Sequence, residues 1–300
     1  MSTYDDASLI YYPSGYKASK AYSLKPTDGS GDLTFTRAST ATRVNSAGLI
    51  ESVATGVPRI DYTGGGCGKL LLEPQRTNLV TYSSEFDNAD WLKINSTITA
   101  NSDISLDGTQ NADRIYDDAV SGQHRVGENI SVVSGTTYTF SVFAKKGTLR
   151  YCYLLTSASG TNVRYYFDLQ DGVSITVGGK IEDYGSGWYR ISAQVAAAAT
   201  GNSLFTFNLT DSSSSITYSG TGTGYHMIYG YQCEAGSYAT SYIPTTTTAV
   251  TRVADNASVT TPAGVTQITE TFGNGSTNVI TSIPATYTAS LGNIQSIIMI

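Results

Sequence analysis

The stretch Thr136–Ala144 (TTYTFSVFA) decides the fold class of this chain. Tyr138, Phe140 and Val142 alternate with threonine and serine, which is the two-residue period of a strand with one face in a core. Threonine, tyrosine, valine and phenylalanine also favour extended backbone. The segment therefore predicts a half-buried strand, in which only Phe143 interrupts the alternation.

Further strand patterns follow this one along the chain, with turn residues between them. In Trp188–Ala196, for example, every second residue from Tyr189 to Val195 is apolar or aromatic. No segment shows a convincing helical period with capping residues. Regularly spaced short strands are typical of an antiparallel sandwich or barrel, so we predict an all-β chain. The other expected strands are Arg150–Thr156, Val163–Leu169, Leu204–Leu209 and Tyr225–Glu234.

The chain divides into three expected parts. Gly64-Gly65-Gly66 marks a boundary, so residues 1–69 form an N-terminal attachment segment, residues 70–256 the main β-domain and residues 257–300 a C-terminal β extension. Residues 1–34 have little core of their own and must pack on another surface. Thr251–Asp255 (TRVAD) echoes Thr36–Ser39 (TRAS) and Thr42–Asn45 (TRVN), which suggests strands with equivalent neighbours.

Composition limits the partners of this chain. Only 14% of its 300 residues are charged and the net charge is −6, which argues against duplex nucleic acid as a partner. No apolar run is long enough for a membrane span, so no membrane insertion is expected. The first residues contain neither a basic nor an apolar segment of a secretory signal, so we expect the chain to be made and folded in a cytoplasm.

No catalytic constellation is recognisable. Nucleophile-elbow, phosphate-loop and zinc-protease motifs are all missing from the sequence. The two histidines, His124 and His226, read as surface or edge-strand residues rather than as catalytic bases. The acid doublets Asp117-Asp118 and Glu182-Asp183 point to opposite faces of a strand and do not form the acid pair of a glycosidase. We therefore expect no enzymatic activity.

The sequence offers few candidates for a metal site or a disulfide. Asp103, Asp107 and Asp117 are candidate calcium ligands because they lie close together in sequence among carbonyl-rich turns, although ordinary Asx-turns are the favoured explanation. No other cofactor is expected. The three cysteines at wide spacings read as three buried free thiols, with one disulfide plus a free thiol as the alternative.

Tyrosine is the unusual feature of the composition, with 22 copies against 8 phenylalanines and 2 tryptophans. Tyrosine rings combine an apolar face with a polar hydroxyl, which suits sugar rings and wet protein interfaces. The alternative is that tyrosine simply fills the core face of each strand. By two-residue spacing, Tyr151 and Tyr153 share one face, as do Tyr229 and Tyr231. The glycan or interface candidates are Tyr151, Tyr153, Tyr165, Tyr166, Tyr229 and Tyr231.

An ordered set of short motifs resembles a module of tailed-bacteriophage virion proteins, namely tail fibres, tail spikes and head fibres. That module is in turn similar to carbohydrate-binding jelly rolls of bacterial glycanases. The motifs, in chain order, are FTRASTATRVN (35–45), GLIE (48–51), LLLEPQRTNL (70–79), SSEFDNADW (83–91), DGT (107–109), TTYTFSVFAK (136–145), YFDL (166–169), GWYR (187–190), QCEAGSYATSYIP (232–244) and TRVAD (251–255).

The resemblance implies a jelly-roll β-sandwich in a non-enzymatic structural protein of a phage virion. It implies homo-oligomers, with a trimer favoured, contacts with other virion proteins, and host cell-surface polysaccharide as a candidate ligand. Trp91 and Trp188 are expected core anchors, and Glu73, Arg76 and Glu234 are expected strand-end devices, joined by hydrogen bonds across the sheet. The alternatives are a polysaccharide-degrading tail spike or a free carbohydrate-binding module.

Overall fold

The computed structural model describes residues 3–300 and confirms the predicted all-β class. The described helices are one short α-helix, α1 (Thr3–Asp6), and a 3₁₀ turn, η1 (Pro13–Gly15). The chain forms two compact units. Residues up to Gln75 and residues Arg252–Ile300 make up the flanking unit, and Arg76–Thr251 make up the sandwich unit.

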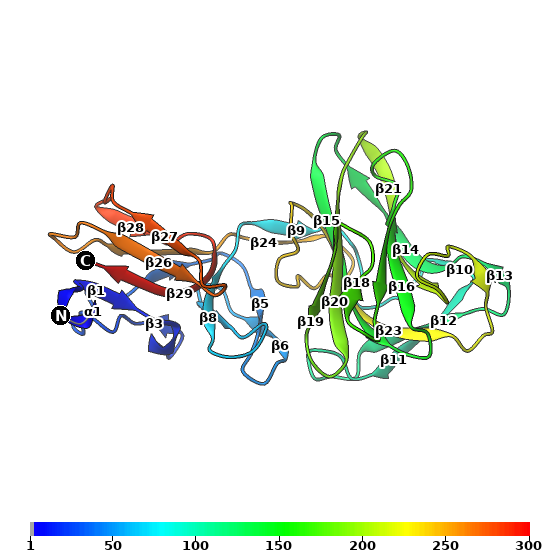
Figure 1. Cartoon of the computed structure of the whole chain (residues 1–300), viewed down its shortest axis with the longest axis horizontal. Helices are drawn as coiled ribbons and strands as arrows, with labels where there is room; N and C mark the ends of the chain where they lie inside the picture. The colour runs from blue at the N-terminus through cyan, green and yellow to red at the C-terminus, as the bar shows by residue number, and fades with distance from the viewer. Residues whose placement is uncertain (1–2) are drawn as a thin grey trace. The chain divides into compact units, whose positions relative to one another are not determined.

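The sandwich unit contains two six-stranded antiparallel sheets (Figure 1). In the first sheet the strand order is β10 (Leu92–Ile94), β14 (His124–Val132), β21 (Gly201–Thr210), β16 (Tyr151–Thr156), β17 (Val163–Asp168) and β18 (Val173–Ser174). In the second sheet it is β11 (Ser96–Asp103), β12 (Ala112–Asp117), β23 (Tyr225–Ala235), β15 (Thr137–Lys146), β20 (Trp188–Ala196) and β19 (Gly179–Asp183).

The core of the sandwich lies between these sheets. Phe140 and Val142 of β15 meet Phe205 and Phe207 of β21 there, and all four side chains are buried. The chain passes repeatedly from one sheet to the other, as in a jelly roll. Two short ladders complete the unit, β13 (Ser121–Gly122) with β22 (Tyr218–Ser219) and β9 (Arg76–Asn78) with β24 (Val250–Arg252).

The flanking unit is built from both ends of the chain, which the sequence analysis treated as separate segments. Its main sheet has the order β27 (Thr277–Ile280), β26 (Ile268–Phe272), β29 (Gly292–Met299), β8 (Lys69–Leu72) and β7 (Arg59–Asp61), and β1 (Leu9–Tyr11) also pairs with β29. Smaller ladders are β28 (Thr286–Thr288), β25 (Asn256–Thr260) and β4 (Thr34–Thr36); β5 (Ala41–Val44) and β6 (Ile50–Val53); and β2 (Tyr16–Lys17) and β3 (Lys20–Ala21).

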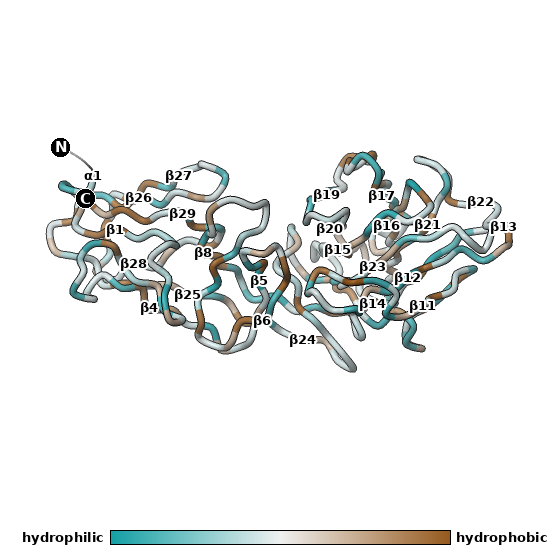
Figure 2. The backbone as a smooth tube through the Cα atoms, turned by 90° about the horizontal axis from the view of Figure 1, so that it is seen from below, coloured by the Kyte–Doolittle hydropathy of each residue, from teal (hydrophilic) through white to brown (hydrophobic). Residues whose placement is uncertain are grey.

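The two ends of the chain share one hydrophobic core in this unit. Leu9 and Tyr11 near the N-terminus are fully buried together with Ile294 and Ile297 near the C-terminus. Figure 2 shows the hydrophobic character of β29, the strand on which β1, β8 and β26 pair. We expected residues 1–34 to need another surface, and residues 3–34, which the structure describes, find it within the same chain.

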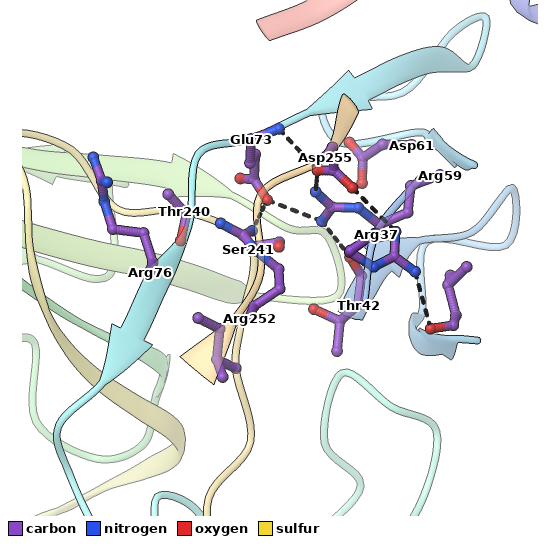
Figure 3. Close-up of polar contacts among 12 residues, drawn as sticks. Arg37, Thr42, Arg59, Asp61, Glu73, Arg76, Thr240, Ser241, Arg252 and Asp255 are labelled. Carbon is purple, nitrogen blue, oxygen red and sulfur yellow. Dashed lines mark hydrogen bonds and ion pairs between the residues drawn. The ribbon is translucent and has the colours of Figure 1, made fainter. Parts of the chain in front are cut away.

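A buried ionic network joins these segments of the flanking unit (Figure 3). Asp255 accepts hydrogen bonds from Arg37 Nη1, at 3.0 Å, from Arg59 Nη2, and from the backbone N–H of Glu73, at 2.8 Å. Glu73 Oε2 in turn pairs with Arg59 Nη1 at 2.9 Å and with Arg252 Nη1. The echoed TRAS and TRVAD motifs thus meet, because Arg37 of the first motif pairs with Asp255 of the second.

Neutral carbonyl groups complete this network. Three arginines face two carboxylates, which leaves one excess positive charge among these five side chains. Backbone oxygens accept the remaining N–H groups, including Ala54 O from Arg37 at 2.7 Å and Pro74 O from Arg252 at 2.6 Å. Since a buried charge is tolerated only when paired and hydrogen-bonded, each member of the network depends on the others.

Replacing Asp255 by alanine should destabilise the flanking unit by about 3–5 kcal/mol, because it leaves Arg37 and Arg59 buried with less compensation. Both tryptophans, Trp91 and Trp188, belong to the sandwich unit, so tryptophan fluorescence follows that unit alone. Urea unfolding should show an earlier loss of hydrogen-exchange protection in β8, β25 and β29, with an unchanged fluorescence midpoint.

The matched control is Glu51→Ala, which breaks the partly exposed Arg43–Glu51 pair at 2.7 Å in the same unit. Surface pairs contribute about 0–1 kcal/mol, so this variant should unfold almost as the parent does. Equal effects of the two substitutions would show that the buried network is not what stabilises the unit.

Candidate functional site

The six candidate tyrosines separate into three environments. Tyr165 and Tyr231 lie in the sandwich core, where Tyr165 packs edge-on against Phe140 and Tyr231 against Trp91. Tyr229 lies on the outer face of the second sheet, buried against Phe143 and Tyr242. Tyr151, Tyr153 and Tyr166 lie together on the outer face of the first sheet, since the intervening Cys152, Leu154, Tyr165 and Phe167 belong to the core.

The expectation that Tyr229 and Tyr231 share one face is wrong, because a β-bulge intervenes. Opposite β15, Ser141 pairs with Gln232 whereas Phe143 pairs with Tyr229, so β23 contains one extra residue. Gly230 has φ of +59°, a conformation that glycine adopts readily. The extra residue reverses the alternation, which turns Tyr231 into the core and leaves Tyr229 outside.

A single cross-strand row of polar and aromatic residues occupies the outer face of the first sheet. Arg125 of β14 pairs with Asn208 of β21, Asn208 with Tyr153 of β16, and Tyr153 with Tyr166 of β17. The rings of Tyr153 and Tyr166 lie 5.0 Å apart at an interplanar angle of 34°. We call this row, with the neighbouring Tyr151 and Arg164, the tyrosine face.

The serine-rich loop 211–217 lies over part of the tyrosine face. Tyr166 Oη donates to Ser214 O at 3.1 Å, and Tyr153 Oη to Ile216 O at 3.4 Å. Burial, and then the neighbouring Tyr166, raise the pKa of Tyr153 to about 12, while Arg125 and Arg164 oppose this shift. Tyr166 remains partly exposed at the edge of the loop. The face therefore presents one covered and one accessible ring.

Asn208 lies at the centre of the row with an unsatisfied oxygen. Its side chain is fully buried, and Nδ2 donates to Tyr153 O at 3.2 Å and to Thr206 Oγ1 at 2.7 Å. Oδ1 has no donor among the residues that the structure describes. Since buried polar atoms are nearly always hydrogen-bonded, this oxygen keeps an unused capacity to accept a hydrogen bond.

Sequence reasoning missed the arginines of this face. No strand was expected at residues 124–132, but Arg125 belongs to β14 there. Val126, Ile130 and Val132 of this strand face the core, whereas Arg125, Gly127 and Asn129 face outward. The alternation of Val126, Ile130 and Val132 was the signal that could have revealed this strand. Two further strands, β11 and β12, lie where only acidic turns were expected.

The calcium candidates do not form a site. Asp103 pairs with Lys145 at 3.0 Å, and Asp107 accepts from the backbone N–H of Thr109 at 2.8 Å. Asp117 accepts from the backbone N–H of Gly224 at 2.9 Å. Within residues 3–300, no three histidine, cysteine or acidic side chains are placed to hold a metal ion. These aspartates instead fix turns and strand ends of the sandwich.

The histidines and cysteines also differ from expectation. Both His124 and His226 are fully buried, and β23, which carries His226, lies between β12 and β15 rather than at a sheet edge. Cys152 and Cys233 are buried free thiols, but Cys67, which was expected to be buried, is exposed.

No helix in the described part of the chain has the length and apolar character to span a bilayer.

The expected structural residues occupy distinct places. Trp91 packs in the sandwich core against Phe86, with 4.8 Å between the ring centroids. Trp188 is equally buried but, contrary to expectation, is not part of that core cluster; it alternates with the core residue Ile191 and lies beneath Lys145 on the other face of the sheet. Arg76 Nε lies 3.7 Å from Glu234 Oε2 within the sandwich unit. Glu73 belongs to the ionic network of the flanking unit.

No protein-family model and no curated protein matches this sequence. Similar solved structures include the enzymatically active domain of tailspike protein 4 of bacteriophage CBA120, with 13% identity, TM-score 0.34 and coverage of 52% of this chain and 21% of that one. They also include the CBM22-1–GH10 modules of Clostridium thermocellum xylanase 10B complexed with xylohexaose, with 18% identity, TM-score 0.33 and coverage of 57% and 30%. A third is TmCBM61 in complex with β-1,4-galactotriose, with 12% identity, TM-score 0.35 and coverage of 53% and 99%.

The chain thus spans less than a third of the first two structures. With TM-scores of at most 0.35, these likenesses carry no argument about function. The sheet order and strand registers of the sandwich unit define its fold independently of these likenesses.

The sandwich unit should lose stability in acid through His226. Burial lowers the pKa of His226 from 6.5 to about 4. In the neutral ring Nε2 donates to Tyr151 O, at 3.0 Å, and Nδ1 accepts from the backbone N–H of Gly147, at 3.4 Å. A depressed folded-state pKa gives stability that is complete above pH 6.5 and is lost as the pH falls towards 4, about 3 kcal/mol in all.

The variant His226→Gln retains one donor and one acceptor but does not titrate. Its unfolding free energy, from urea titrations followed by tryptophan fluorescence, should fall less steeply between pH 6.5 and 4 than that of the parent. His124 and the carboxylates are present in both proteins. The difference between the two curves of unfolding free energy against pH therefore reports the titration of His226. Parallel curves would refute the assignment.

Proposed function

We propose that this chain is a non-enzymatic structural protein of a bacteriophage virion, of tail-fibre or head-fibre type, that binds host-surface glycans through the tyrosine face. The observation that carries the glycan part is the row Arg125–Asn208–Tyr153–Tyr166. It combines a ring for stacking, a guanidinium group and a buried carbonyl oxygen without a donor. Sugar-binding sites combine these elements, a flat apolar surface with a few placed polar groups.

Each element of the row has a part in this function. The partly exposed ring of Tyr166 offers its face to the apolar side of a pyranose, and the Asn208 oxygen accepts a sugar hydroxyl once loop 211–217 moves aside. Arg125 supplies donors at the β14 end. The rigid sheet holds these groups in register, so little ordering is needed on binding.

The virion part of the proposal is supported by the ordered sequence motifs between residues 35 and 255. The flanking unit would provide attachment to other virion proteins, and three copies would assemble into the fibre or decoration. Since Leu9, Tyr11 and Leu33 lie in the core of the flanking unit, its attachment surface must be exposed residues rather than a loose N-terminal arm.

Tyr166→Ala should weaken binding to a polysaccharide panel at least tenfold, which corresponds to about 1.4 kcal/mol, because it removes the accessible stacking surface. The matched control is Tyr116→Ala, since Tyr116 is a partly exposed tyrosine on the outer face of the second sheet. Affinity electrophoresis of the full chain in gels containing each polysaccharide gives the comparison. Equal losses in the two variants would exclude the tyrosine face, and release of reducing ends would indicate a depolymerase.

The chain should copurify with intact phage particles in a density gradient, and mass photometry of the purified protein should give the mass of three copies. Antibodies raised against the sandwich unit should label those particles in electron microscopy. A monomer that remains in the particle-free fraction would contradict both the virion assignment and the trimer.

A further inference from the structure

The tyrosine face carries two arginines that have no acidic partner. Arg125 Nη1 donates to the neutral amide Gln123 Oε1 at 2.8 Å, and Arg164 Nη1 approaches the backbone oxygen of Asn162 at 3.5 Å. Neither arginine takes part in an ion pair among the residues that the structure describes. Both remain partly exposed, and Arg164 Nε is a buried donor without an acceptor.

The arginines flank the stacked tyrosines. Arg125 lies in the same row as Tyr153, two strands away, and Arg164 lies on β17 in the next row, opposite Leu155. With strands about 4.8 Å apart, the backbones of β14 and β17 are separated by about 14 Å across the sheet. A ligand on Tyr166 that extends over Tyr153 once loop 211–217 has moved would meet Arg164 beside Tyr166 on β17 and Arg125 towards β14.

The acidic residues near this face either form ion pairs with another arginine or lie at its edge. Asp168, in the row of Tyr151, is held by Arg150 at 2.6 Å, and Arg150 also binds Asp171 at 2.5 Å. Asp211 lies where the covering loop begins. In a chain of net charge −6, an area with two arginines and no acid between them is suited to an anionic ligand.

We propose that the ligand of the tyrosine face is a carboxylated glycan, such as a polymer containing uronic acids, whose carboxylates bind Arg125 and Arg164. This inference rests on the proposed glycan-binding function and specifies its substrate class. Planar guanidinium groups match carboxylates in a bidentate geometry, whereas a neutral sugar would offer them no charged partner. Asn208 Oδ1 and the Tyr166 ring recognise the sugar itself, which distinguishes the ligand from an acidic peptide.

The test uses the full-length protein and matched polymers: polygalacturonate, alginate and hyaluronan as acidic glycans, carboxyl-reduced polygalacturonate and xylan as neutral ones, and polyglutamate as a polyanion without sugar. Calorimetric titration should show binding to an acidic glycan that weakens at least tenfold after carboxyl reduction. The same binding should weaken when NaCl rises from 50 to 500 mM.

Arg125→Gln combined with Arg164→Gln should reduce acidic-glycan affinity at least tenfold and remove most of the salt dependence. Arg114→Gln is the matched control, because Arg114 is a partly exposed arginine on the second sheet, where it lies over the rings of Tyr116 and Tyr225. It should change affinity less than twofold. Tryptophan fluorescence unfolding of each variant verifies that the sandwich unit is folded.

The outcomes separate the two proposals. Equal binding to polygalacturonate and its carboxyl-reduced form, or an unchanged affinity of the double arginine variant, overturns the carboxylate inference and leaves glycan binding standing. Binding to polyglutamate as strong as to the acidic glycans reduces the face to a general anion surface and overturns the inference. Binding to none of the polymers overturns the proposed glycan function together with the inference.

Discussion

Asp255 and Glu73 are the residues on which the flanking unit depends, because they bring together chain segments that are remote in sequence. Arg37 and Asp255 are 218 positions apart, and Arg252 and Glu73 are 179 positions apart. The whole sandwich unit lies between Glu73 and Arg252 in the chain. Closing so long a loop costs only slightly more entropy than closing a short one, so a few strong buried contacts are sufficient. Those contacts cannot form until residues 252–255 have been synthesised, whereas the sandwich unit is continuous and has no such requirement.

The two sheets of the sandwich unit differ in the tyrosines on their outer faces because β23 contains a β-bulge. A regular β23 would place Tyr229 and Tyr231 on one face, but the extra residue at Gly230 sends Tyr231 into the core beside Trp91. On the other sheet no bulge interrupts β16 and β17, and Tyr151, Tyr153 and Tyr166 remain outside. Of the tyrosines predicted as recognition candidates, only these three therefore share a surface.

Much of this fold could be predicted from sequence where the two-residue period was strong. The segment around Tyr138, Phe140 and Val142 forms β15, and the pattern Tyr189–Val195 forms β20 within its expected bounds. Strands and the faces of their side chains could not be predicted where the alternation of apolar and polar residues was hidden or broken. In β14 Gly127 and Glu128 obscured the apolar positions, and in β23 the bulge reversed them. Pairings between distant segments, such as Arg37 with Asp255, are marked in the sequence only by the similarity of two short motifs. That similarity does not specify which residues form the ion pairs.

The two sets of arginines show how context decides the role of the same side chain. In the flanking unit Arg37, Arg59 and Arg252 are buried, and carboxylates and carbonyl groups satisfy them, so they have no capacity left for a ligand. On the tyrosine face Arg125 and Arg164 have neutral partners only among residues 3–300, and they keep access to solvent. A stabilising arginine would be expected beside an acid, and this chain has 24 acidic residues against 18 basic ones. These two arginines face outward beside Tyr153, Tyr166 and the side-chain oxygen of Asn208, and this combination is the basis of the proposed carboxylate site.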